Sequence, residues 1–136
     1  MLQFYFLSIA TNLIGGFILA SDKIIEKFPN LTAFAELFKK NSSKMMLGIF
    51  TIIFGVFKIL SVTKGDIIVV GDIIPALSGI IVGSTLAVES YKMRSTVSTP
   101  AVERLDNVFV KNKSLIGIAG IIIGLLHFLF PSVLLL

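Results

Sequence analysis

Four long apolar stretches constrain the fold of this chain more than any other feature. They lie at residues 2–20, 45–62, 72–88 and 114–136. A helix needs about 20 mostly apolar residues to cross the hydrocarbon core of a bilayer, which is about 30 Å thick. Backbone polar groups inside a bilayer must be paired within the protein, so stretches of this length predict helices. The sequence therefore predicts an all-α integral membrane protein with four transmembrane helices.

The composition agrees with this class. Of 136 residues, 55% are hydrophobic and 15% are charged, whereas a water-soluble domain has about 45–50% apolar and about 25% charged residues. The chain has no cysteine and one histidine, His127, which excludes disulfides, thiolate metal sites and a site built from several histidines. We therefore expect no cofactor and no metal.

The basic residues predict the orientation. Ten of the twelve Lys and Arg residues lie in the first and third connections, and basic loops face the cytoplasm. This explains the net charge of +4 without a nucleic-acid partner. Both termini are expected outside the cytoplasm. Short loops, many Lys and Ile residues and no eukaryotic targeting signal favour a bacterial inner membrane.

The two halves of the chain resemble each other, and such internal repeats determine a fold. The second and fourth stretches align at a spacing of 69 residues, which matches Lys44, Gly48, Ile52 and Gly55 to Lys113, Gly117, Ile121 and Gly124. The first and third align at 67, which matches Gly16, Leu19, Ala20 and Asp22 to Gly83, Leu86, Ala87 and Glu89. We expect one membrane domain, 1–136, built of repeats 1–65 and 66–136. Each repeat is a helix hairpin, and both hairpins have the same orientation.

An amphipathic elbow helix is expected in each cytoplasmic connection. The apolar residues repeat at helical spacing, as Leu31, Phe34 and Phe38 in the first elbow and Val102, Leu105 and Phe109 in the second. Asn30 and Thr99 are the expected N-caps. Such helices lie at the membrane interface. They serve either as a docking surface for a cytoplasmic partner or anionic lipid, or as simple connectors.

Small residues are frequent in the apolar stretches, and glycines let helix backbones approach closely in a membrane. The expected packing positions are Gly16, Gly48, Gly55, Gly79, Gly83, Gly117, Gly120 and Gly124. Two pairs of them have the small-xxx-small spacing. These faces pack within the chain, or against another membrane protein or a second copy.

Ionisable residues within membrane helices are functional candidates. Asp22 and Glu89 match each other near the cytoplasmic side, and Lys58 matches His127 near the outer side. They define a candidate ion or proton path whose polar intermediates are Asn12, Thr51, Ser84 and Thr85. The alternative is that all four are anchors at the membrane boundary, with Lys58 extending toward Asp66 or Asp72.

Enzyme motifs are missing from the sequence. It contains no HExxH motif, phosphate-binding loop, dinucleotide-binding glycine motif or plausible nucleophile with a base, so we expect no catalysis. The expected role is a small integral membrane subunit or scaffold that docks or stabilises a larger membrane complex. Its partners are the lipid bilayer and another membrane protein or a second copy. The alternative is a small oligomeric ion channel or proton-linked transporter.

Overall fold

The structure is a computed structural model that describes residues 2–38, 40–60 and 73–130. Over these residues all regular elements are helical and no strand is present, which confirms the all-α class. The long helices are α1 (Leu2–Lys27), α3 (Asn41–Leu60), α4 (Ile73–Arg94) and α6 (Lys113–Leu129). The short ones are η1 (Pro29–Leu31), α2 (Thr32–Glu36), α5 (Pro100–Leu105) and the π-helix η2 (Asp106–Val110).

Three of the long helices, α1, α3 and α4, are long and apolar enough to cross a membrane. A fourth candidate span consists of α6 together with the segment Pro100–Val110, and the chain bends by 54° between the two parts. The described residues therefore contain three to four helices compatible with membrane spans. The end of the fourth predicted stretch, 131–136, lies outside the described residues, as do Asp66 and Asp72.

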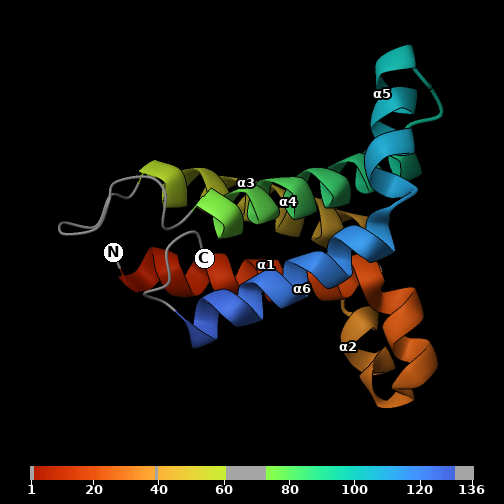
Figure 1. The fold of residues 1–136 in the computed structure, drawn as a ribbon. Coiled ribbons are helices and arrows are strands. Elements are labelled where there is room, and N and C mark those ends of the chain that lie inside the picture. The colour runs from red at the N-terminus through yellow and green to blue at the C-terminus, as the bar shows by residue number, and fades with distance from the viewer. Residues whose placement is uncertain (1, 39, 61–72, 131–136) are drawn as a thin grey trace.

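The long helices lie side by side in one bundle (Figure 1). Helix α1 packs mainly on α6, and α3 packs mainly on α4. At one end of the bundle, α2 and α5 project in opposite directions (Figure 1). We call this the elbow end. The far end is the opposite one, where α1 begins and α6 ends.

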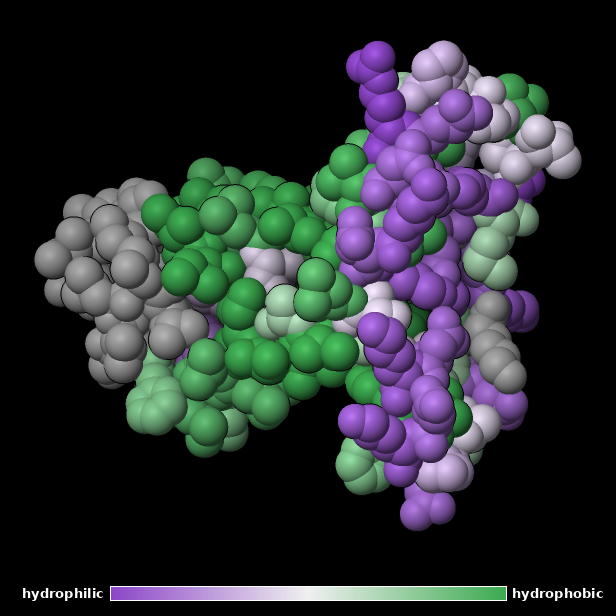
Figure 2. All heavy atoms as spheres, turned by 45° about the vertical axis from the view of Figure 1, so that its right-hand side comes forward, coloured by the Kyte–Doolittle hydropathy of each residue, from purple (hydrophilic) through white to green (hydrophobic). Residues whose placement is uncertain are grey.

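The surface of the molecule changes from apolar to hydrophilic along the axis of the bundle. Figure 2 shows apolar residues covering the visible face of the bundle and hydrophilic residues gathered in a band at the elbow end. Large side chains exposed on the bundle include Phe6, Phe50, Leu77, Ile122 and Leu125. A surface that is apolar over the length of the helices and polar at the elbow end is compatible with a bundle that spans a bilayer.

The helices extend beyond the predicted apolar stretches where the flanking residues are polar but still favour a helix. Helix α1 continues through Lys27, beyond the apolar stretch that ends at Ala20, because Lys, Glu and Ile are adequate helix formers in water as well as in lipid. Helix α3 begins at Asn41, four residues before the apolar stretch that starts at Met45. Both extensions carry the helices past the apolar region at the elbow end.

One of the two predicted caps is confirmed. The Thr99 side chain accepts a hydrogen bond from the Val102 nitrogen and caps α5. The prediction for Asn30 is wrong, because a 3₁₀ turn begins at Pro29 and places Asn30 inside it. Proline is well suited to the first position of a helical turn, which moves the boundary to Phe28, whose side chain makes no capping bond.

Candidate functional site

Helices α1 and α6 cross at a pair of glycines. A Cβ atom placed on Gly16 would lie 2.6 Å from the Gly117 carbonyl oxygen, and one on Gly117 would collide with the Gly16 carbonyl oxygen. The Gly117 position also faces the Ala20 nitrogen at 2.8 Å. A residue with a side chain cannot occupy either position at this separation, so the two glycines allow the close backbone contact.

Helices α3 and α4 cross in the same manner. A Cβ atom on Gly83 would lie 2.6 Å from the Gly48 carbonyl oxygen, and one on Gly48 would lie 2.8 Å from the Gly83 carbonyl oxygen and 3.0 Å from the Ala87 nitrogen. These residues occupy the positions that the sequence alignment matched to those of the first crossing. The bundle thus contains an α1/α6 pair and an α3/α4 pair, each held at a glycine crossing.

The remaining predicted glycines also contact helices of the same chain. Gly55 faces the Ala76 carbonyl oxygen at 2.9 Å, and Gly79 faces the Asn12 amide nitrogen at 3.3 Å. Gly120 faces a Val82 methyl at 2.8 Å, and Gly124 faces Leu13 at 3.1 Å. All eight glycine positions are therefore occupied by contacts within this chain.

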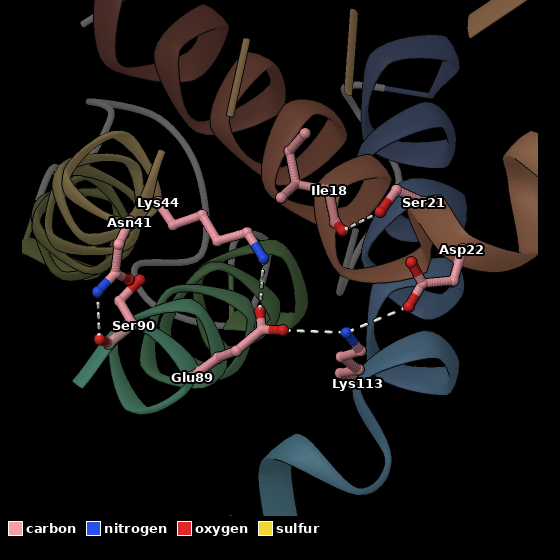
Figure 3. A network of polar contacts seen from close by, with 8 residues as sticks. All are labelled: Ile18, Ser21, Asp22, Asn41, Lys44, Glu89, Ser90 and Lys113. Atoms are coloured by element: carbon pink, nitrogen blue, oxygen red, sulfur yellow. Dashed lines mark hydrogen bonds and ion pairs between the residues drawn. The ribbon is translucent and has the colours of Figure 1, made fainter. Parts of the chain in front are cut away.

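Each long helix contributes one charged side chain to a network at the elbow end (Figure 3). Lys113 Nζ lies 2.9 Å from Glu89 Oε1 and 3.3 Å from Asp22 Oδ2, and Lys44 Nζ lies 3.4 Å from Glu89 Oε2. The Glu89 side chain is 12% exposed, whereas that of Asp22 is 74% exposed. Glu89 is the central acid, and its contact with Lys113 joins the two helix pairs.

An apolar layer separates this network from the rest of the bundle interior. Ile18 and Leu19 of α1 pack against Val82 and Leu86 of α4 in a fully buried cluster. Leu19 and Leu86 have no exposed surface. Along α1 and α4 this layer lies between the charged network and the buried polar residues Asn12 and Ser78.

Polar side chains gather in the middle of the bundle, below the apolar layer. The Asn12 amide donates to the Ser8 and Pro75 carbonyl oxygens at 3.0 and 3.1 Å, and Ser78 Oγ donates to Asn12 Oδ1 at 2.9 Å. Asn12 is 1% exposed. Its contacts with Ser78 and Pro75 again join the α1/α6 pair to the α3/α4 pair. Thr51 and Thr85 are also buried, and each donates to the carbonyl oxygen one turn earlier.

At the far end, Tyr5 of α1 contacts both predicted basic residues. Lys58 Nζ lies 5.0 Å from the centroid of the Tyr5 ring, within the range of a cation–π contact. The His127 ring lies 4.8 Å from the Tyr5 ring, and Tyr5 Oη donates to the His127 carbonyl oxygen at 2.7 Å. Lys58 is 8% exposed and His127 is 1% exposed. Both ionisable residues are thus inside the bundle.

The structure therefore brings together each predicted pair of ionisable residues, Asp22 with Glu89 through Lys113, and Lys58 with His127 through Tyr5. The sequence analysis missed the residues that join them. The signal for Lys44 and Lys113 was present, because they match each other at the starts of the aligned helices. Tyr5 carried no such signal.

The elbow residues differ in their surroundings. The Phe34 ring lies 5.2 Å from Phe17 of α1 and 5.7 Å from Phe38, which packs on the apolar layer. Leu31 and Leu105 are exposed, whereas Val102 and Phe109 are half-buried. The first elbow is therefore attached to the bundle through aromatic contacts.

Among the described residues, no group of three or more His, Cys, Asp or Glu side chains is placed to hold a metal ion. No curated protein and no solved structure matches the chain. A protein-family model matches residues 1–127, and its description states no activity, substrate or partner. Because the match covers most of the sequence, the chain belongs to this family.

Proposed function

We propose that this protein is a non-enzymatic membrane protein that conducts protons across the bilayer between its two helix pairs. The observation that carries the proposal is the set of buried polar contacts between the pairs: Glu89 with Lys113, Asn12 with Ser78, and Tyr5 with Lys58. Buried polar and ionisable side chains are costly in a membrane and mark ion and proton pathways.

A proton suits this interior better than a hydrated ion. The Asn12 side chain contacts the Pro75 carbonyl oxygen and Ser78 Oγ directly, at 3.1 and 2.9 Å, so no hydrated ion fits between these groups in the middle of the bundle. His127 is buried at the far end, and its imidazole ring is a group that can accept and donate protons. The apolar layer of Ile18, Leu19, Val82 and Leu86 closes the pathway in this conformation.

The glycine contacts favour this function over the scaffold role that the sequence favoured. A scaffold was expected to dock through glycine faces and elbows, and all eight glycines face residues of the same chain. A subunit role is the second candidate, and the exposed apolar residues of the elbows, Leu31, Leu105 and Val108, favour it. Recovery of a larger membrane protein at fixed stoichiometry, lost in Val108→Asp, would support that role.

We also propose that the two halves are duplicated hairpins and that the elbow end faces the cytoplasm of a bacterial cell. The matched glycine crossings support the duplication, because equivalent residues make equivalent contacts in the α1/α6 and α3/α4 pairs. The basic residues of the first and third connections support the orientation. Both termini are then outside the cytoplasm.

The test is proton flux into liposomes that contain the purified protein and a trapped pH-sensitive dye, driven by a potassium diffusion potential. The wild-type protein is expected to change the internal pH faster than empty liposomes do. Glu89→Gln and His127→Gln are expected to abolish this difference. The matched control is Asp22→Asn, which removes a carboxylate that contacts the same lysine but is mostly exposed, and its flux should persist.

Two results would contradict the proposal. Wild-type flux equal to that of empty liposomes would exclude proton conduction by the protein alone. Equal flux in the wild type, Glu89→Gln and His127→Gln would show that the buried groups are not on the pathway. Circular dichroism and size-exclusion profiles identify variants that fail to fold.

A further inference from the structure

An apolar groove lies at the elbow end between the start of α3, the end of α4 and α5. Met45, Ala87, Val88, Tyr91, Val102 and Leu105 line it. The groove has a volume of about 380 Å³, within the range of sites that hold small-molecule ligands. Its walls supply almost no polar surface, so its occupant must be apolar where it enters the groove.

A cation lies about one helical turn beyond the lining residue Tyr91. Arg94 lies three residues after Tyr91 on α4, about 4.5 Å farther along the helix axis, and it donates to Ser42 Oγ at 2.5 Å. Ser42 precedes Met45 by three residues and is on the same side of α3. The contact between Arg94 and Ser42 therefore spans α3 and α4 next to the lining residues Tyr91 and Met45.

Neighbouring acids do not neutralise this arginine. Asp106 pairs with Lys92 at 2.7 Å, Glu103 accepts a hydrogen bond from Ser98, and Glu89 is held by Lys44 and Lys113. Within the described part of the chain, Arg94 makes no ion pair with a carboxylate. A guanidinium group with free donors is well suited to bind phosphate oxygens.

Tyr91 indicates the depth of the groove in the membrane. It is 44% exposed and lines the groove one turn before Arg94. Tyrosine is enriched at the boundary between hydrocarbon and headgroups. The apolar lining then lies at the depth of acyl chains, and Arg94 lies at the depth of lipid phosphates.

We propose that this groove binds one anionic phospholipid, with an acyl chain against Val102 and Leu105 and the headgroup phosphate on Arg94. The combination of an apolar groove with a cation at its polar end matches the chemistry of such a lipid. A free phosphate ion would leave the apolar lining exposed, so the proposal is for the lipid. It does not depend on proton conduction.

The opposite side of the bundle supports this assignment by contrast. There the first elbow places the Phe34 ring 5.2 Å from the Phe17 ring of α1. Phe34 is the residue that the sequence alignment matches to Leu105, and Lys27 matches Arg94. On the first side the Phe34 ring packs on α1, whereas on the second side the smaller Leu105 lines the groove.

The experiment measures lipid binding to the full-length protein by native mass spectrometry from neutral detergent. The probes are phosphatidylglycerol and phosphatidylcholine with identical acyl chains, added at equal concentrations. The wild type is expected to retain one phosphatidylglycerol in preference to phosphatidylcholine. Arg94→Gln should weaken phosphatidylglycerol binding about tenfold, since it removes a charge-assisted contact, and Arg94→Lys should retain part of the preference.

Two further variants make the test specific to the groove. Val102→Trp is expected to fill it and to lower the binding of both lipids. Lys27→Gln is the matched control, because it removes an exposed cation at the corresponding end of α1, which does not line this groove. This variant should bind phosphatidylglycerol as the wild type does.

The proposal is overturned if the two lipids bind equally to the wild type, or if Arg94→Gln binds phosphatidylglycerol as tightly as the wild type. Unchanged lipid binding in a folded Val102→Trp protein would also overturn it and would leave the groove to an occupant other than lipid. Leu105→Trp repeats this measurement should Val102→Trp fail to fold.

Discussion

At each glycine crossing, a single backbone carbonyl oxygen determines whether a residue larger than glycine fits. At Gly117 an added Cβ would collide with the Gly16 carbonyl oxygen, and backbone cannot move aside as a flexible side chain can. At Gly79 the nearest groups to an added Cβ lie 3.3 and 3.4 Å away. The two positions are both helical glycines, yet they differ in the space that a methyl group would find.

We predict that Gly117→Ala destabilises the folded protein by about 1–3 kcal/mol, the usual cost of overpacking a filled interior. The measurement is unfolding of the protein in mixed micelles with increasing sodium dodecyl sulfate, followed by circular dichroism. Gly79→Ala is the control and should have a much smaller effect. A similar loss of stability in both variants would argue against the glycine crossing as the cause.

Asn12 is the residue whose side chain joins the helix pairs in the middle of the bundle. Asn12→Leu removes the bonds to Pro75 and Ser78 and should destabilise the protein by about 1–2 kcal/mol, since interhelical hydrogen bonds in membranes contribute modestly and Ser78 loses its acceptor. A double-mutant cycle with Ser78→Ala measures the coupling. Strictly additive effects of the two substitutions would show that the bond contributes nothing to stability.

The sequence was least informative about which helices pack against each other. Apolar length was sufficient to predict α1, α3 and α4, and matched positions identified Gly16 with Gly83 and Gly48 with Gly117. Which glycines meet was not predictable, because small-xxx-small spacing marks a contact face without naming its partner. In the structure, α1 packs mainly on α6 although α3 is the next long helix along the chain.

The same limit explains the residues that the sequence analysis missed. Tyr5 lies in an apolar stretch with several aromatic residues, and only the packing of α1 against α3 and α6 places it between Lys58 and His127. Lys113 was visible as a residue at a helix start. Its role between Asp22 and Glu89 depends on how α1, α4 and α6 meet at the elbow end.

The apolar layer is the contact between α1 and α4 that closes the proposed pathway. Replacing Leu86, which has no exposed surface, by asparagine is expected to let water enter the layer and to increase proton flux above the wild-type rate. The same liposome assay measures it. Leu86→Ile is the control for altered shape without polarity. A flux in Leu86→Asn at or below that of Leu86→Ile would contradict the proposed closure.

In the whole molecule, the contacts within each helix pair differ from the contacts between the two pairs. Backbone packing at glycines, which tolerates little change, holds each pair together. The pairs meet through polar contacts, one apolar layer and side chains packed on Gly79 and Gly120, without a second backbone-to-backbone glycine crossing among the described glycines. A movement that opens the pathway is therefore expected to preserve the pairs and to change the contacts between them.

The proposed orientation of the whole bundle rests on the charge of its connections and can be measured without the activity. The chain has no cysteine, so single cysteines report their own side of the membrane. Lys40→Cys and Lys111→Cys are at the elbow end and should react with an impermeant thiol reagent only from the cytoplasm, because basic segments remain there. Gln3→Cys, at the exposed start of α1, should react only from outside. Labelling of Gln3→Cys and Lys111→Cys from the same side would mean that α1, α3 and α4, the long helices between these positions, do not all cross the membrane. Labelling of both elbow positions from outside would invert the pathway, with Glu89 at its outer mouth and His127 at its cytoplasmic one.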